Sequence, residues 1–262
     1  MKFGICTVSL MPMRISPDDR SEMVNQALFG EILEIVDIKE NWAYIKLDYD
    51  NYTGWVDVKQ IKEISEHEYS QISNSDLYFS SDLVQVLTHL QSKQLITIVL
   101  GSLLPNYSNK NLNIADNFYS YEGSVISNPQ KIQRRTILEN AMMYLNAPYL
   151  WGGKSPFGID CSGFSQMVYK LSGIALMRDA SQQVMQGETI SFISDAVAGD
   201  LAFFDNNEGR IIHVGILLGD NKIIHASGKV RIDSIDHNGI FNNDRGVYTH
   251  NLRVIKQYCP AE

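Results

Sequence analysis

Cysteine is scarce in this sequence, and the few cysteines present are poorly placed for a disulfide framework. Cys6, Cys161 and Cys259 are odd in number and lie far apart in the 262 residues. Disulfide-stabilised secreted domains carry even numbers of closely spaced cysteines. We therefore expect free thiols in a reducing compartment.

The sequence also lacks clustered positive charge and long apolar runs. Its 22 Lys and Arg are scattered among 30 Asp and Glu, which gives a net charge of −8 and predicts no nucleic-acid partner. No apolar run approaches the roughly 18 to 20 residues that span a bilayer. We therefore expect no membrane span.

The opening segment MKFGICTVSLMPMRISP does not have the pattern of an export signal. Its apolar run is broken within about ten residues by Thr, Ser, Pro and Arg, whereas a signal peptide has an uninterrupted apolar core. We interpret it as a first strand. The protein is then expected in the cytoplasm if Met1 is the natural start, and in the periplasm or outside the cell if a leader was removed.

Short strands are predicted throughout the N-terminal half. Apolar and polar residues alternate over 31–38, 42–49 and 54–58, with polar turn residues between them. Such spacing in residues 1–63 predicts a small barrel. Residues 64–125 have a loosely similar character and are interpreted as a second β module or a linker.

The pattern changes near residue 129, where helical periodicity begins. Apolar residues recur at helical spacing over 129–148, and a second helical stretch starts at DCSG, residues 160–163. Strand-like segments follow to the C-terminus. Helices followed by adjacent strands predict an α+β domain with an antiparallel sheet over 126–262.

Cys161 is placed at the predicted start of the second helix. The unpaired N–H groups and the dipole at a helix N-terminus stabilise a thiolate, and the same N–H groups can hold a developing oxyanion. A lone cysteine is more often a small hydrophobe in the core. A nucleophile also requires a base.

Two histidines on a predicted hairpin supply candidates for that base. His213 and His225 flank Gly219-Asp220-Asn221. With a two-residue turn they would face opposite sides of the sheet. With a three-residue turn, the residue numbers of each cross-strand pair add up to 440. His225 then lies opposite Gly215 and diagonal to His213, on the same face. We predict the latter, with His213 as base and His225 as the residue that orients it.

The same three side chains allow a metal-dependent alternative. Cys161, His213 and His225 could be zinc ligands, although no fourth ligand at short spacing is evident. His237 and His250 are too distant in sequence to be assigned. Spacing favours thiol catalysis, with neither metal nor cofactor.

Five segments in a fixed order resemble the NlpC/P60 family of cell-wall cysteine peptidases. They are PYLWGGKSPFGIDCSGF, MRDASQQ, AGDLAFF, HVGILLG and IIHASG, within about residues 130 to 258. The resemblance implies a papain-like α+β fold that hydrolyses peptide bonds in peptidoglycan stems. It implies the roles given above for Cys161, His213 and His225. It also implies that Trp151, Asp160, Ser162, Asp179 and Ser181 line the substrate groove, although Ala180 stands where this subgroup often has Ser.

The N-terminal part resembles the bacterial SH3-like modules of γ-D-glutamyl-L-diamino acid endopeptidases, which act in murein recycling. In that subgroup the module caps the groove and supplies a Glu for the substrate amine and a Tyr from its last hairpin. Glu22 matches the first, and Tyr52, with Tyr49 as the alternative, matches the second. Without the resemblance, Glu22 would be read as a surface charge.

These observations predict a papain-like NlpC/P60 domain preceded by one or two small all-β SH3-like barrels. The expected activity is hydrolysis of the γ-D-glutamyl-L-diamino acid bond in small stem peptides with a free N-terminal L-Ala. Two alternatives remain: a wall-binding protein without catalysis, and a peptidase that acts on intact cell wall.

Overall fold

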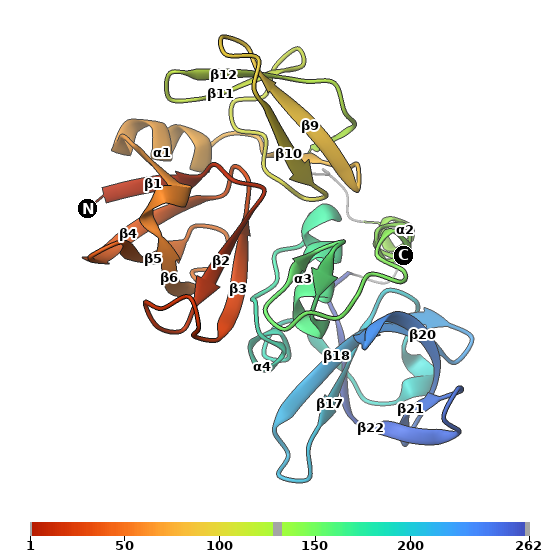
Figure 1. Ribbon diagram of the computed structural model, residues 1–262. Coiled ribbons are helices and arrows are strands. Elements are labelled where there is room, and N and C mark those ends of the chain that lie inside the picture. The colour runs from red at the N-terminus through yellow and green to blue at the C-terminus, as the bar shows by residue number, and fades with distance from the viewer. Residues whose placement is uncertain (1, 128–132, 260–262) are drawn as a thin grey trace. The chain divides into compact units, whose positions relative to one another are not determined.

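A computed structural model describes residues 2–127 and 133–259 of the chain. Its contacts divide the chain into two compact units (Figure 1). Unit 1 comprises residues 1–129 and 151–156, and unit 2 comprises residues 130–150 and 157–262. The division into three domains that the sequence suggests stays a prediction.

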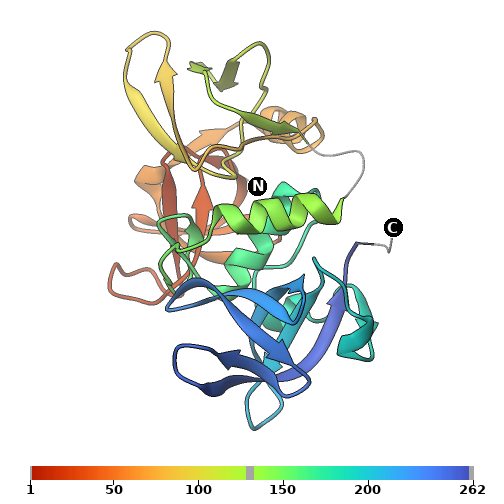
Figure 2. The same ribbon diagram turned by 90° about the vertical axis from the view of Figure 1, so that its right-hand side faces the viewer.

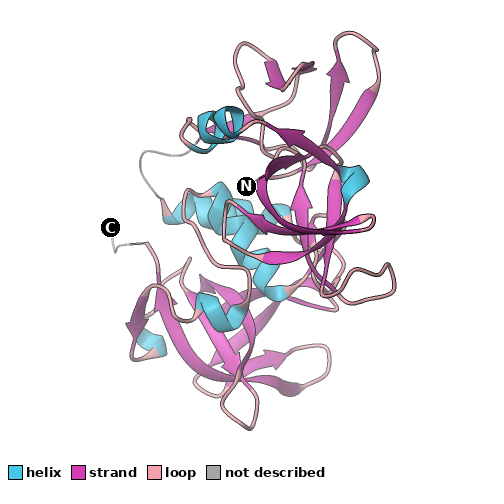
Figure 3. Cartoon of the chain, turned by 90° about the vertical axis from the view of Figure 1, so that its left-hand side faces the viewer, coloured by secondary structure: helices cyan, strands magenta, loops and turns pink. Residues whose placement is uncertain are grey.

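Unit 1 begins with a seven-stranded antiparallel sheet in the order β3-β2-β6-β5-β4-β1-β7. Its strands curl around a common core (Figure 3). They are β1 (Lys2–Cys6), β2 (Leu10–Arg14), β3 (Met23–Leu28), β4 (Ile32–Lys39), β5 (Trp42–Leu47), β6 (Thr53–Asp57) and β7 (Ile61–Ile64).

The barrel forms because buried and exposed residues alternate along its strands. Along β5, Ala43, Ile45 and Leu47 are buried and their neighbours are partly exposed. Met11, Met13 and other apolar residues of the neighbouring strands complete the same core. Each strand thus presents one apolar face to the interior. The strands predicted at 31–38, 42–49 and 54–58 are confirmed, with bounds shifted by one or two residues. The single strand predicted at the N-terminus is wrong, because that segment forms the two strands β1 and β2.

The second module of unit 1 follows helix α1 (Glu66–Ser73), whose first turn is closed by a capping box between Ser65 and Glu68. A four-stranded sheet has the order β10-β9-β12-β11, and β8 pairs with β13. These strands are β8 (Tyr78–Ser80), β9 (Val84–His89), β10 (Leu95–Val99), β11 (Asn111–Ile114), β12 (Asn117–Tyr121) and β13 (Val125–Ser127). Short strand β14 (Lys154–Ser155) also belongs to unit 1.

Unit 2 begins with two helices that lie side by side (Figure 2). Helix α2 spans Arg134–Met143, and helix α3 spans Cys161–Leu171 after strand β15 (Gly158–Ile159). Helix α3 is buried at every position, which identifies it as the central helix of the unit. Residues 129–132 of the predicted first helix lie outside the described residues. The predicted second helix is confirmed.

A seven-stranded antiparallel sheet completes unit 2, in the order β16-β22-β17-β18-β19-β20-β21. Strand β21 also pairs with β22, so that six of the strands close into a barrel. The strands are β16 (Glu188–Ile190), β17 (Leu201–Asp205), β18 (Ile211–Gly219), β19 (Lys222–Ser227), β20 (Lys229–Asp236), β21 (Gly239–Asn242) and β22 (Val247–Gln257), with the short helix α4 (Ala180–Gln183) before them.

This architecture confirms the predicted fold class: an α+β unit with its helices on an antiparallel sheet, preceded by all-β structure. The described helices are all too short or too polar to cross a membrane.

Gly30 permits close packing between the two β modules of unit 1. Its φ is +82°, and a Cβ there would lie 2.1 Å from the carbonyl oxygen of Leu103. The backbone N–H of Leu103 also donates to the Phe29 carbonyl at 2.9 Å. A side chain at position 30 would therefore force the modules of unit 1 apart.

We expect Gly30→Ala to lower the free energy of unfolding by about 3 kcal/mol, the sum of a left-handed backbone penalty and a steric clash. Gly209→Ala is the matched control, because Gly209 has a φ of +76° but open space around it. It should cost only about 1 kcal/mol. Urea unfolding measures both, and equal losses would contradict the packing role of Gly30.

Candidate active site

Cys161 is the first residue of the buried helix α3. Asp160 is the N-cap, and its Oδ1 accepts the backbone N–H of Gly163 at 2.6 Å. This cap fixes the first turn of the helix and therefore the position of the cysteine. The side chain of Cys161 lies in the wall of a pocket in unit 2 that also includes His213 and His250.

The thiol of Cys161 is held between α3 and β18. Its pKa is raised to about 12 by burial first and by the charge of Asp160 second. Hydrogen bonds from the backbone N–H groups of Val214 and Ser162, and the charge of Arg178, act in the opposite direction. A thiolate here is thus unfavourable alone, and we expect it to form only together with a cation at His213.

The hairpin formed by β18 and β19 brings the two histidines together. Gly215 pairs with His225, so residue pairs sum to 440 and both histidines face the same side, as predicted. The predicted three-residue turn is wrong. Gly219 pairs with Lys222 across a two-residue turn, and a bulge between Leu217 and Gly219 restores the register.

The physical reason lies in the turn residues. Asp220 and Asn221 have φ values of +48° and +56°. Positive φ at both central positions is the requirement of the tight hairpin turn that matches strand twist. The extra residue needed to place the histidines on one face is therefore supplied by the bulge.

His213, His225 and Asp233 form a chain of hydrogen bonds. Nε2 of His213 lies 2.9 Å from Nδ1 of His225, and Nε2 of His225 lies 3.1 Å from Oδ2 of Asp233. The carboxylate can only accept, so the neutral form of His225 donates from Nε2 and accepts at Nδ1. His213 then carries its proton on Nε2. Its Nδ1 has the lone pair that can take a proton.

Arg231 fixes the charge at the end of this chain. Its Nε and Nη2 donate to the two oxygens of Asp233 at 2.8 and 2.9 Å. Burial opposes the charge on Asp233, yet hydrogen bonds from His225 and Arg231 lower the pKa of this carboxyl to about 2. Asp233 is therefore an anion at all ordinary pH values, as the tautomer assignment requires.

His213 and His250 are both neutral imidazoles. Burial, followed by the neighbouring His250 and His225, lowers the pKa of His213 well below its usual range. Burial and His225 lower the pKa of His250 to about 4, against the opposing charge of Asp233. His213 can therefore act as a base without first losing a proton.

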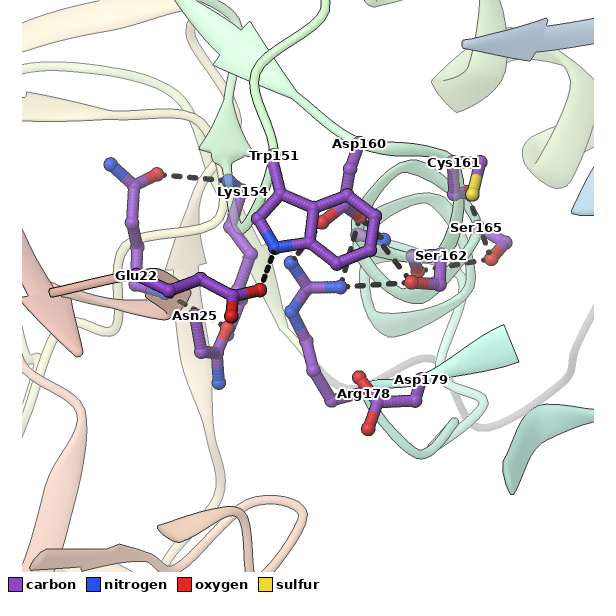
Figure 4. Close-up of polar contacts among 12 residues, drawn as sticks. Glu22, Asn25, Trp151, Lys154, Asp160, Cys161, Ser162, Ser165, Arg178 and Asp179 are labelled. Atoms are coloured by element: carbon purple, nitrogen blue, oxygen red, sulfur yellow. Dashed lines mark hydrogen bonds and ion pairs between the residues drawn. The ribbon is translucent and has the colours of Figure 1, made fainter. Parts of the chain in front are cut away.

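Asp160 and Ser162 are held by a buried arginine that the sequence interpretation did not single out. Arg178 donates to both oxygens of Asp160, at 2.9 and 2.6 Å, and to Oγ of Ser162 at 2.9 Å (Figure 4). All three are nearly fully buried. The charge of Asp160 is thus largely compensated by Arg178, and the predicted place of Asp160 and Ser162 along the substrate groove stays a prediction.

Asp179 and Ser181 lie at helix α4. Asp179 is its N-cap, and the backbone N–H of Asp179 donates to Oε1 of Gln182 at 3.1 Å. Ser181 is exposed, whereas the neighbouring Ala180 is buried. Their predicted places along a substrate groove stay predictions.

Within unit 1, Glu22 contacts Trp151. The indole Nε1 donates to Oε1 of Glu22 at 2.6 Å (Figure 4). The following Gly152 has a φ of +76°, and a Cβ there would lie 2.5 Å from the carbonyl oxygen of Met23. Glycine therefore allows residues 151–156 to lie directly against β3.

Lys154 anchors the same segment. Its side chain is fully buried and its Nζ lies 3.6 Å from Oε1 of Glu31, which is also buried. Its backbone N–H donates to Oε1 of Gln26 at 2.9 Å. A buried ion pair of this kind requires both partners, because either charge alone would be strongly destabilising.

Tyr52 and Tyr49 lie near the last hairpin of the barrel. Tyr52 is half-buried and packs against the barrel core, and its backbone N–H donates to Oδ1 of Asp50 at 3.0 Å. The choice between Tyr52 and Tyr49 as a substrate-binding residue stays a prediction.

The histidines also form the only group of possible metal ligands among the residues that the structure describes. Nitrogen atoms of His213, His225 and His250 lie within 4.8 Å of one another. Both nitrogens of His225 are in hydrogen bonds, however, and His213 and His250 stack with ring planes at 24°. Stacked rings direct their lone pairs along similar planes rather than toward one point. The geometry thus fits a hydrogen-bonded relay better than a metal centre.

A cysteine at the start of a buried helix, packed against an antiparallel sheet that carries a histidine and its polar partner, defines the papain-like class of cysteine peptidases. The chain belongs to the NlpC/P60 family. The model of that family matches residues 146–248, and a model described as the bacterial dipeptidyl-peptidase Sh3 domain matches residues 13–61.

Individual proteins are similar over most of the chain. Dipeptidyl-peptidase 6 of Lysinibacillus sphaericus is 30% identical over 84% of this chain and 87% of its own length. The gamma-D-glutamyl-L-lysine dipeptidyl-peptidase of Bacillus subtilis is 30% identical over 86% of this chain and 75% of its own. The fold matches the crystal structure of an NlpC/P60 family protein from Bacillus cereus with a TM-score of 0.84, at 21% identity over 98% and 100% of the two chains.

Three residues near the candidate site escaped sequence interpretation. Arg178 lies in the segment MRDASQQ, and nothing in the sequence around it indicates that its side chain is buried. Asp233 follows His225 by eight residues across one further turn, and His250 comes from the last strand. The pairing of β17 with both β18 and β22 places His250 beside His213.

Replacement of Arg178 tests its compensation of Asp160. We expect Arg178→Met to lower the free energy of unfolding by about 3 to 5 kcal/mol, because a buried carboxylate would lose its cation. Arg178→Lys keeps the charge without the two-pronged contact and should cost less. Arg135→Met, at an exposed ion pair with Glu139, is the control and should cost under about 0.5 kcal/mol. Similar losses at 178 and 135 would contradict the assignment.

Asp233→Asn should reduce kcat/KM, because the amide no longer enforces the tautomer of His225. We expect a loss of roughly tenfold to hundredfold, less than the roughly 10⁴-fold found where an aspartate contacts the base directly. The folded pKa of about 2 lies below the unfolded value, so the charge of Asp233 stabilises the fold above pH ~4. The stability difference between wild type and variant should therefore shrink as pH falls from about 4 to 2. A constant difference would contradict this.

Proposed function

We propose that the protein is a cysteine endopeptidase that hydrolyses the γ-D-glutamyl-L-diamino acid bond of peptidoglycan stem peptides with a free N-terminal L-Ala. The observation that carries this proposal is the relay from Asp233 through His225 to His213, beside Cys161 in one pocket. Membership in the NlpC/P60 family and the two dipeptidyl-peptidase relatives support the choice of substrate.

The proposed reaction proceeds through an acyl-enzyme. Nδ1 of His213 takes the proton of Cys161 as Sγ attacks the carbonyl carbon of the γ-glutamyl group. The same nitrogen returns the proton to the amine of the diamino acid, which leaves. Water, activated by His213, then cleaves the thioester and releases L-Ala-D-Glu. His225 and Asp233 fix the tautomer throughout.

Backbone N–H groups at the start of α3 are suited to stabilise the oxyanion. The N–H of Ser162 already interacts with the sulfur of Cys161, at the positive end of the helix dipole. Donors fixed by a helix need no reorganisation when charge develops on the carbonyl oxygen.

Glu22 is proposed to bind the ammonium of the N-terminal L-Ala. Its carboxylate is exposed and is oriented by the hydrogen bond from Trp151. A carboxylate held in this way loses little freedom when it binds a cation, which favours a charge-assisted contact. An acetylated N-terminus would not provide the cation.

The decisive assay compares L-Ala-γ-D-Glu-diaminopimelate with its N-acetylated twin, read by mass spectrometry. We expect release of L-Ala-D-Glu from the free-amine peptide only, and no release by Cys161→Ala. Cleavage of neither peptide would contradict the proposed activity and favour a binding protein. Cleavage of intact cell wall would favour the wall-acting alternative.

Glu22→Gln tests amine recognition separately. We expect kcat/KM for the free-amine peptide to fall roughly tenfold to hundredfold, the value of one charge-assisted hydrogen bond. Asp19→Asn removes an exposed charge from the same loop and serves as the control. An unchanged preference for the free amine in Glu22→Gln would refute the role of Glu22 and leave the peptidase activity standing.

A further inference from the structure

His250 has no place in the catalytic chain described above, yet it is in close contact with the proposed base. Its ring stacks on that of His213 with centroids 4.1 Å apart and planes at 24°. It also lines the pocket that contains Cys161. This is a close aromatic contact, and it involves the residue that must become a cation during the reaction.

The ring of His213 is in contact with three neighbouring rings. Its Nε2 edge is bonded to His225, and its Nδ1 edge is the one left for the thiol proton. His250 covers one face, and Phe204 of β17 approaches at 5.7 Å with planes at 45°. Nδ1 of His250 lies 2.9 Å from Oγ1 of the adjacent Thr249.

The charge state of His250 also affects how easily His213 becomes a cation. A neutral aromatic face attracts a cation that lies over it, whereas a second cation at that distance would repel it. The titratable or charged groups that face His250 are His213 on β18, His225 on β19, Asp233 on β20 and the thiol of Cys161 on α3. Of these, only Asp233 favours a charge on His250.

We propose that His250 is a positioning residue whose neutral ring holds His213 in the orientation that presents Nδ1 to the pocket and stabilises the imidazolium formed when Cys161 loses its proton. This proposal rests on the proposed roles of Cys161 and His213. It requires the aromatic face of His250, and it does not require its nitrogens. Phenylalanine should therefore replace it and alanine should not.

Alkylation of Cys161 by iodoacetamide measures the proposed effect without any substrate. The thiolate alone reacts, so the rate at neutral pH reports how much of the thiolate–imidazolium pair is formed. We expect a roughly tenfold loss of this rate in His250→Ala, because the imidazolium loses the aromatic face that stabilises it. His250→Phe should remain within about threefold of wild type.

Alkylation at low pH tests separately what a positive charge on His250 does. Protonation of His250 in wild type places a cation against His213, so alkylation should decline as pH falls through about 4. His250→Phe cannot be protonated and should decline less over the same range. His237→Ala, at an exposed histidine of the same unit, should match wild type throughout.

Two outcomes would overturn the proposal. An unchanged rate in His250→Ala would show that the stack contributes nothing. A loss in His250→Phe equal to that in His250→Ala would assign the effect to the nitrogens. Thermal unfolding checks that each variant is folded, and Cys161→Ala gives the background from Cys6 and Cys259. If the rates change as expected but no stem peptide is cleaved, the proposed substrate is wrong and the role of His250 stands.

Discussion

The hydrogen bond between Nε2 of His213 and Nδ1 of His225 is the interaction on which the rest of the candidate site depends. It can form only if both histidines project from the same face of the hairpin, and a shift of one residue would separate them. The bulge after Leu217 is therefore a functional feature of the strand. A two-residue turn alone would place the two histidines on opposite faces. The bulge shifts the register by one residue and places them on the same face.

Burial determines how charge can arise around this bond. The thiol of Cys161 and the imidazole of His213 are both held in their neutral forms by burial. Proton transfer between them creates two charges at once, each of which stabilises the other. The buried anion Asp160 opposes the thiolate, and Arg178 compensates it. The arginine thus stabilises the helix cap. It also offsets part of the repulsion between the cap and a thiolate at Cys161.

The sequence predicted most of the fold, because its strands alternate with period two and the apolar residues of its longer helices recur at helical spacing. It also predicted that His213 and His225 share a face, since register follows from arithmetic on a hairpin. It did not predict the bulge, because positive φ at Asp220 and Asn221 is a property of the folded turn. Arg178 and His250 were missed for another reason: their contacts join segments distant in the chain. Only the packing of helix α3 and the pairing of β17 with both β18 and β22 bring them to the site.

The chain between residues 150 and 157 is packed within unit 1. Residues 151–156 belong to unit 1 by their contacts. In the sequence they lie five to ten residues before Cys161, which belongs to unit 2. Within that unit Lys154 is fully buried against Glu31, and Trp151 bonds Glu22. A flexible linker would not bury a charged residue, because an unpaired buried charge is strongly destabilising. The segment before strand β15 is thus an ordered part of unit 1, held there by the ion pair of Lys154 with Glu31.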